Sequence, residues 1–345
     1  MKKTISTIFL ISIFLAFMLF INVNAESEDR LRTIIRVAYP TATLINGHIG
    51  QVLLRTNILE RNNLSGEVTG FQYGPPMMEA LVSGKVDVAF TSEVPATLPL
   101  AQGHKAKIIA TFGSLGRNAI LVQGGSSIKS VKDLKGKKVG VPFGSSPHRN
   151  LLGMLKEAGL AADKDVSVLN IGRDEIASVL LKGGVDAIMI WDPALEQYVR
   201  KNNFNIVESS YFHSVVIMNT DFIQNHPEGA KNFLSALKEA VLFMATHKDE
   251  VNVWFGEVSR LDPEIINACA EFNHNYRTVK KISDVKIVPD DNFLEMMRQS
   301  AQFTFAQKMV PQLADIDKSI DSSLLKEAEK KLDDNTYNPL EVVIR

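Results

Sequence analysis

Two patterns of apolar and polar positions alternate along this chain: short apolar runs of strand length and longer stretches with apolar residues at helical spacing. The short runs predict strands at residues 33–39, 67–73, 86–90, 107–112, 119–123, 138–141, 166–170, 187–190, 205–207 and 215–218. Helical spacing predicts helices between them, as at residues 48–59 and 75–82. Strands that alternate with helices in this way favour an α/β fold with a mainly parallel sheet.

The last third of the chain has a different pattern. Beyond Asp221 the apolar residues recur at helical spacing, and amphipathic helices are predicted at residues 227–247, 290–308 and 322–332. We expect these helices to pack on the first of two lobes.

Two distant segments have similar sequences, which suggests the two lobes. Residues 84–95 read GKVDVAFTSEVP, and residues 183–193 read GGVDAIMIWDP. In each, a Gly ends a helix, Val-Asp leads into an apolar strand, and an acidic residue precedes a Pro that opens a helix. Their separation of about a hundred residues is far longer than a solenoid period, so it indicates two similar lobes. Chance similarity between two helix–strand units is the alternative.

This repeat sets the expected domain organisation. We expect a signal segment at residues 1–25, a first lobe at 26–123, a second lobe at 124–212, and a return to the first lobe with C-terminal helices at 213–345. The small residues GGSS at 124–127 make a plausible hinge. A second hinge is expected at residues 209–213.

The strongest local signal for a binding site is the stretch 134–158, LKGKKVGVPFGSSPHRNLLGMLKEA. It predicts a strand, a small-residue loop at Gly144-Ser145-Ser146, and a helix opened by Pro147. The first turn of a helix has unpaired N–H groups and a partial positive charge, and two hydroxyls stand beside it, so an anion would be stabilised there. The alternative is that Ser146 is only an N-cap.

In a parallel sheet, ligands bind beyond the carboxyl ends of the strands. The candidate binding residues fall in or beside the loops expected at that edge: Thr41, Ser92, Glu93, Ser145, Ser146, His148, Trp191, Asp192 and His213.

Several of these candidates have two interpretations. Trp191 is expected either to offer a flat face to an apolar ligand body or to pack internally. Glu93 either caps its helix or accepts a ligand ammonium or hydroxyl, and Asp192 has the same capping alternative. His148 lies in the first turn of a helix, where the dipole disfavours imidazolium, so a neutral hydrogen-bonding role is expected unless it faces solvent.

The N-terminus has the features of a secretory signal peptide. Lys2 and Lys3 precede an apolar run at residues 8–21, and Val23-Asn24-Ala25 places small residues where signal peptidase cleaves. We expect cleavage after Ala25 and a periplasmic location. The alternative is an uncleaved anchor, because the apolar run is long.

Composition excludes several functional classes. The chain has 38 basic and 39 acidic residues and no basic run, so nucleic acid is not an expected partner. Its one cysteine, Cys269, allows no intrachain disulfide. No phosphate loop, nucleophile elbow or zinc-protease motif occurs, and the histidines lack metal-ligand spacing. We expect neither a cofactor nor a metal, and no enzymatic activity.

The block VKDLKGKKVGVPFGSSPHRNLLGMLKEAGL resembles the solute-binding proteins of sulfonate, taurine and nitrate ABC importers. ALVSGKVDVAFTSEVPATLPLAQG upstream and VDAIMIWDPALEQ downstream extend the resemblance. That family includes binders of thiamine-type pyrimidines. The resemblance implies the two-lobed type II periplasmic binding protein fold, an anion at Gly144-Ser145-Ser146, and Trp191 beside the organic tail. Ser92 departs from the glycine that many members have before the acidic residue.

These features predict the periplasmic substrate-binding subunit of an ABC importer, a monomer that captures a small organic anion, alkanesulfonate or taurine, in the cleft between hinged lobes. Its partners would be the membrane permease and ATPase subunits. A thiamine-type pyrimidine or other planar heterocycle is the alternative ligand. A periplasmic enzyme or a sensor-associated binding protein on the same scaffold is the alternative of another class.

Overall fold

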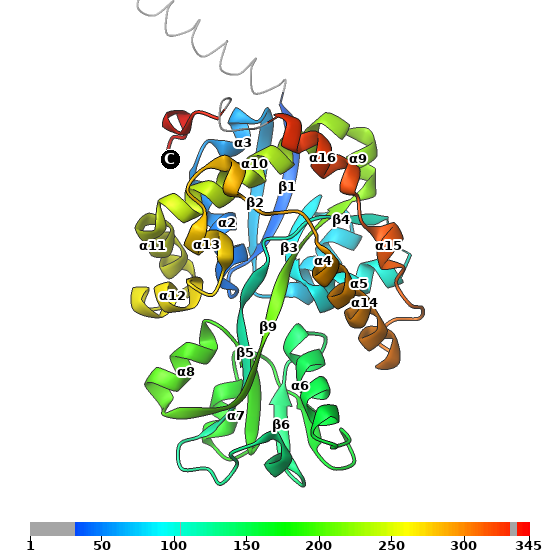
Figure 1. The fold of residues 1–345 in the computed structure, drawn as a ribbon, viewed down its shortest axis with the longest axis vertical. Helices are drawn as coiled ribbons and strands as arrows, with labels where there is room; N and C mark the ends of the chain where they lie inside the picture. Colours follow the sequence, from blue (N-terminus) through cyan, green and yellow to red (C-terminus); the bar gives the residue numbers. More distant parts are fainter. Residues whose placement is uncertain (1–31, 104, 332–336) are drawn as a thin grey trace, which may run out of the picture.

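The computed structural model describes residues 32–103, 105–331 and 337–345, and the expected signal segment lies outside these ranges. Figure 1 shows two lobes, one above the other, with β5 (Ser114–Gln123) and β9 (Phe204–Asn219) running between them. The strands follow the order β2-β1-β3-β9-β5-β8-β6-β7, and β4 pairs with β9 beside that path. We call the part built on β1–β4 the first lobe and the part built on β5–β8 the second lobe.

The sheet of the first lobe is mixed. Its strands β1 (Thr33–Pro40), β2 (Leu64–Phe71) and β3 (Val88–Ser92) are parallel. β9 runs antiparallel to both β3 and β4 (Ala106–Ala110). The expectation of a mainly parallel sheet therefore holds for the βαβ part of this lobe, whereas the returning chain adds antiparallel pairs.

The second lobe has the same plan. β6 (Lys138–Val141) is parallel to β7 (Ser167–Asn170) and β8 (Ala187–Trp191). β5 is antiparallel to β8 and to β9.

β9 is one strand of 16 residues, so the prediction of two separate strands at 205–207 and 215–218 is wrong. Its first half pairs with β5, and from Ser214 onward it pairs with β3 and β4. The polar residues between the two apolar halves pair at the junction of the lobes, which is why the apolar pattern is interrupted there. This change of partners supports a crossing near His213.

The first crossing differs from the expected position. β5 was expected to end the first lobe, but among the described residues it pairs with β8 of the second lobe and with residues 204–213 of β9. The pairing therefore favours a crossing near Gly113, where the backbone has φ +78°, over residues 124–127. A lobe boundary at about residue 113 is our proposal for the domain organisation.

The helices have the bounds α2 (Leu44–Arg55), α3 (Ile58–Arg61), α4 (Gly74–Val82), α5 (Glu93–Ala101), α6 (Ser146–Glu157), α7 (Ile176–Leu181), α8 (Ala194–Asn202), α9 (Thr220–Asn225), α10 (Pro227–Thr246), α11 (Lys248–Ser259), α12 (Pro263–Ala270), α13 (His274–Thr278), α14 (Asp291–Ala306), α15 (Ile316–Ser319) and α16 (Ser322–Lys331). Those after β9 gather on the first lobe (Figure 1). α10 packs on α2, and α14 packs on α5. α14 also contacts α6 and α12 contacts α8, so these two helices reach the second lobe.

The repeated segments occupy equivalent places in the two lobes. Asp87 donates its N–H to Arg36 O at 2.8 Å and accepts the N–H of Arg36 on Oδ2 at 2.8 Å. Asp186 makes the same pair of bonds with Lys138, at 2.9 and 2.8 Å. Because each aspartate joins the strand of its repeat to the first parallel strand of its lobe, β1 or β6, the similarity between the segments is structural.

Candidate functional site

The N-termini of α5 and α6 meet where the two lobes touch. Ser146, the first residue of α6, is fully buried. Its hydroxyl donates to Ser92 Oγ at 3.1 Å and accepts the N–H of Val94 at 3.4 Å. The hydroxyl of Ser146 therefore spans the lobes and does not cap its own helix.

The N-cap of α6 is Ser145. Its Oγ accepts the N–H of His148 at 3.3 Å and donates to the carbonyl of Pro142 at 2.6 Å. The alternative that Ser146 serves only as a cap is therefore wrong, because its neighbour has that role.

Glu93 and Arg149 form a buried ion pair across the same junction. Arg149 Nη2 lies 3.1 Å from Glu93 Oε1, and the N–H of His213 donates to Glu93 Oε2 at 3.1 Å. Arg149 also donates to Ser300 Oγ on α14 at 2.5 Å. Arg149 of the second lobe thus binds side chains of both α5 and α14 of the first lobe.

Asp192 is fully buried and paired with Arg117 of β5. Its Oδ2 accepts the backbone N–H and the Nε–H of Arg117 at 3.1 and 3.0 Å. Burial raises the pKa of Asp192, and the hydrogen bonds and charge of Arg117 oppose that shift. The guanidinium also lies over the ring of Phe272, 4.4 Å from its centroid.

Beside this pair are two hydrogen-bond donors without acceptors. Asn118 of β5 lies directly opposite Trp191 of β8, so their side chains project on the same face of the sheet. Both are buried, and Asn118 Nδ2 and Trp191 Nε1 have no partner among the described residues. Asn118 Oδ1, in contrast, accepts from Ser210 Oγ at 2.8 Å and from Asn150 Nδ2 at 3.2 Å. Asn150 is four residues after Ser146 and therefore lies on the same face of α6.

The two histidines at the junction have lowered pKa values. His148 stacks on Phe143, with 4.2 Å between centroids, and meets Phe303 of α14 edge-on at 5.3 Å. Burial lowers the pKa of His148 to about 4, with a smaller opposing effect from Asp163. Burial likewise lowers the pKa of His213. The alternative of a solvent-facing His148 is wrong, since it is 3% exposed.

Thr41 is not joined to the other candidates by any hydrogen bond of the described residues. Its hydroxyl donates to the carbonyl of Phe71 at 3.1 Å, which ties the end of β1 to the end of β2.

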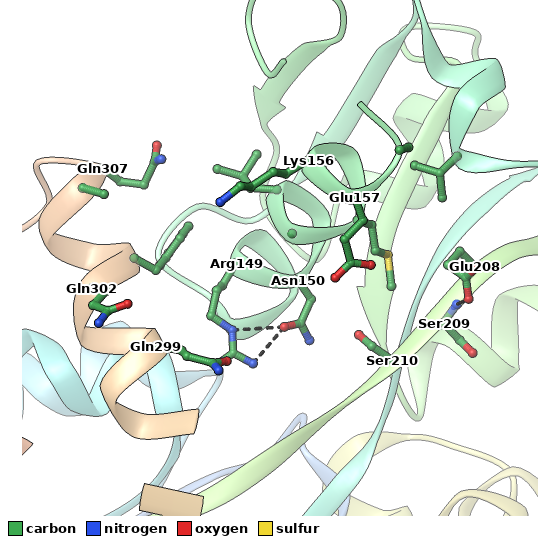
Figure 2. A pocket seen from close by; sticks show the side chains of 17 residues that line it. Arg149, Asn150, Lys156, Glu157, Glu208, Ser209, Ser210, Gln299, Gln302 and Gln307 are labelled. Carbon is green, nitrogen blue, oxygen red and sulfur yellow. Dashed lines mark hydrogen bonds between the residues drawn. The ribbon is translucent and has the colours of Figure 1, made fainter. Parts of the chain in front are cut away.

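A groove of about 800 Å³ lies between α6 and α14. Arg149 and Asn150 are among the residues that line it (Figure 2). Gln299, Gln302 and Gln307 lie on the α14 side, and residues 208–210 of β9 lie opposite. None of the nine candidate residues lines this groove. His213 lines a second cavity, of about 400 Å³.

The junction therefore gathers Ser92, Glu93, Ser145, Ser146, His148 and His213, with Trp191 and Asp192 beside Asn118 and Arg117. Arg149, Asn118 and Arg117 were not predicted. One signal for Arg149 was present in the sequence: a cation in the first turn of a helix opposes the dipole and therefore needs a partner. The predicted strand at 119–123 began after Arg117 and Asn118, because their polarity interrupts the apolar run.

No group of three His, Cys, Asp or Glu side chains in the described part of the chain is arranged to hold a metal. None of the helices within residues 32–103, 105–331 and 337–345 is both long and apolar enough to cross a bilayer.

Comparison with known families identifies the protein. The NMT1/THI5-like family matches residues 73–251, which cover β3, β6, β8 and both helix N-termini at the junction. The chain belongs to the NMT1/THI5-like family.

Relatives of this NMT1/THI5-like protein include one from Bacillus subtilis that is named for aliphatic sulfonate binding, 29% identical over 78% of this chain and 80% of the relative. The taurine-binding periplasmic protein of Escherichia coli is 25% identical over 68% of this chain and 71% of its own length.

Solved structures show the same fold. The periplasmic aliphatic sulphonate binding protein of Escherichia coli has a TM-score of 0.68 at 23% identity, over 84% of this chain and 92% of that one. A desulfurization enzyme has a TM-score of 0.66 at 16% identity, over 87% and 99%. The two-lobed periplasmic binding protein fold expected for this NMT1/THI5-like protein is confirmed, as is its resemblance to sulfonate- and taurine-binding proteins.

Proposed function

We propose that this protein is the periplasmic substrate-binding subunit of an ABC importer and captures a small organic anion, an alkanesulfonate or taurine, at the junction of its lobes. The anion would meet the first turn of α6 and the N–H groups of Asn118 and Trp191. Closure of the lobes around it would present the loaded form to the membrane permease and its ATPase.

The observation that carries this proposal is the pair of buried donors. Buried polar groups in proteins are nearly always hydrogen-bonded, because an unpaired one costs about 1–3 kcal/mol. Asn118 Nδ2 and Trp191 Nε1 can only donate, and both are buried without an acceptor. They lie beside the N-terminus of α6, where the helix dipole also favours an anion. A ligand that brings several acceptor oxygens, such as a sulfonate, satisfies all of these donors at once.

The proposed role of Trp191 is thus wider than first expected. Its ring could still flank an organic tail, and its Nε1–H would in addition bind the anionic head.

A binding role is also supported by the state of the one thiol. Cys269 is buried, and burial together with the charges of Asp192 and Glu196 raises the pKa of its thiol. A thiol of this kind is a poor nucleophile. We therefore propose that the likeness in fold to a desulfurization enzyme does not include cysteine chemistry in this chain.

Location and assembly follow from the same role. We propose export, cleavage after Ala25 and action as a monomer in the periplasm. N-terminal sequencing of the exported protein should start at Glu26, whereas an intact Met1 in the membrane fraction would contradict cleavage.

A thermal-shift screen of residues 26–345 tests the function. Alkanesulfonates, taurine, nitrate and thiamine-type pyrimidines would each be added to the purified protein. A ligand at about a hundred times its dissociation constant should stabilise the fold by about 2.7 kcal/mol. Stabilisation by a sulfonate is the expected result. Stabilisation by a pyrimidine alone would favour the other ligand class, and turnover of any compound would overturn the binding role.

A further inference from the structure

The acidic side chains at the junction already have cationic partners. Both oxygens of Glu93 are taken, one by Arg149 and the other by the N–H of His213. The Glu93 side chain is 0% exposed, and that of Arg149 is 14% exposed. Neither oxygen of this carboxylate is free to receive a ligand cation without breaking an existing bond.

Asp192 is paired in the same way. Arg117 binds Oδ2 through its backbone N–H and Nε, and Nη2 approaches Oδ1 at 3.3 Å. The same guanidinium contacts Glu196 at 2.6 Å, and Arg200 contacts Glu196 at 2.7 Å. Three carboxylates are therefore matched by the guanidinium groups of Arg117, Arg149 and Arg200.

The unpartnered polar groups at the junction carry no negative charge. Asn118 Nδ2 and Trp191 Nε1 are donors, and further buried groups without a partner are the hydroxyl of Thr91 and the Nδ1 atoms of His148 and His213. Asn46 Nδ2 donates to the carbonyl of Thr91. The amide oxygen of Asn46 has no partner, but it carries no charge. A ligand ammonium buried among these described groups would meet no unpaired carboxylate, and an uncompensated buried charge is strongly unfavourable.

We propose that this chain selects organic anions without an ammonium group, so that it prefers alkanesulfonates to taurine, and that the pair Arg149–Glu93 determines this specificity. The inference rests on the proposed function and narrows its ligand class. Arg149 neutralises Glu93, the carboxylate that would otherwise be the counter-charge for an amine.

Two ligands of equal size test the inference. Taurine and propane-1-sulfonate differ only in an ammonium in place of a methyl group. Calorimetric titration of residues 26–345 should give an affinity for propane-1-sulfonate at least about tenfold higher than for taurine. The pair butane-1-sulfonate and 3-aminopropanesulfonate should show the same order.

Variants at the ion pair test its role. Arg149→Met frees the carboxylate of Glu93 and should narrow or reverse the preference, with taurine gaining at least about tenfold relative to propane-1-sulfonate. The double variant Arg149→Met/Glu93→Gln removes both charges and should restore the preference for propane-1-sulfonate. Circular dichroism melts identify any variant that fails to fold. In that case Glu93→Gln alone replaces it, and this variant should still bind propane-1-sulfonate more tightly than taurine.

The outcomes are distinct. Equal or tighter binding of taurine by the wild type would overturn this inference and leave the proposed function intact. Absence of binding to any of the four sulfonates would overturn both. A folded Arg149→Met protein with the wild-type preference would overturn the role assigned to the ion pair.

Discussion

The two neighbouring serines at the start of α6 have different partners. Ser145 caps the helix through the N–H of His148, whereas Ser146 reaches Ser92 and Val94 of the other lobe. A helix cap contributes to the free energy of unfolding. We expect a hydroxyl between the lobes to contribute to ligand affinity instead.

We therefore expect Ser145→Ala to affect mainly stability and Ser146→Ala to affect mainly ligand affinity. Ser145→Ala should lower the free energy of unfolding by about 1 kcal/mol. Ser146→Ala should lower the affinity for an alkanesulfonate by about ten- to a hundredfold, because on binding the hydroxyl would turn its proton from Ser92 to the sulfonate, and a hydroxyl bonded to a charged group contributes about 1.5–3 kcal/mol. Urea denaturation and calorimetric titration measure the two effects. Unchanged affinity in Ser146→Ala would remove its hydroxyl from the anion site.

His48 gives the fold a dependence on pH. It is fully buried, 5.1 Å from the ring of Phe255 and 5.9 Å from that of Tyr276, measured between centroids. Burial lowers its pKa from the ordinary 6.5 to about 3. The unfolded chain therefore takes up the proton at a higher pH than the folded one. The stability that His48 provides is present above about pH 6.5 and is lost as the pH falls towards 3.

The variant His48→Phe keeps an aromatic ring at this position and removes the titration. Between pH 6 and 4, its free energy of unfolding should fall less steeply than that of the wild type, by about 1.4 kcal/mol per pH unit. The exposed His274 provides the control variant His274→Gln, which should follow the wild type. Parallel curves for wild type and His48→Phe, from denaturant titrations at each pH, would contradict the account.

At the scale of elements, much of the fold could be predicted. The strand at residues 138–141 has the predicted bounds, and the helix predicted from Pro147 begins one residue earlier. The repeat placed β3 and β8 in equivalent positions. Short βα units are predictable because the local apolar pattern and the turn residues agree with the fold.

The long antiparallel strands were harder to predict. β9 crosses from one lobe to the other and β5 begins at the other crossing, and their polar stretches pair with each other at the junction. Asn118 and Ser210 are paired although they lie about ninety positions apart in the sequence. The apolar pattern of one segment contains no information about so distant a partner. For the same reason Asn118 and Arg149 were not recognised, although their types and positions were visible.

The repeated aspartates give an element-scale prediction. Asp87 is buried and binds both the N–H and the Nε of Arg36, whereas Asp186 is exposed and binds one N–H of the chain, that of Lys138. Asp87→Ala should lower the free energy of unfolding by about 2 kcal/mol, because it leaves a partly buried cation and an N–H unpaired. Asp186→Ala should cost at most about 1 kcal/mol, since water can replace the carboxylate. An equal or larger loss in Asp186→Ala, in urea denaturation, would contradict this ranking.

At the scale of the whole molecule, the two lobes meet through charged and polar contacts. Arg149 joins α6 to α5 and α14, and Ser146 joins the N-termini of α6 and α5. Lys201 of α8 also forms an ion pair with Asp262, just before α12, at 3.2 Å. This arrangement suits a protein that closes around a ligand and opens again to release it.

A crystal structure of residues 26–345 with propane-1-sulfonate tests the central claim most directly. The account predicts the sulfonate at the junction of the lobes, with its oxygens within hydrogen-bonding distance of Asn118 Nδ2, Trp191 Nε1 and the first turn of α6. A sulfonate bound instead in the groove lined by Gln299, Gln302 and Gln307, with those donors still unpaired, would contradict it.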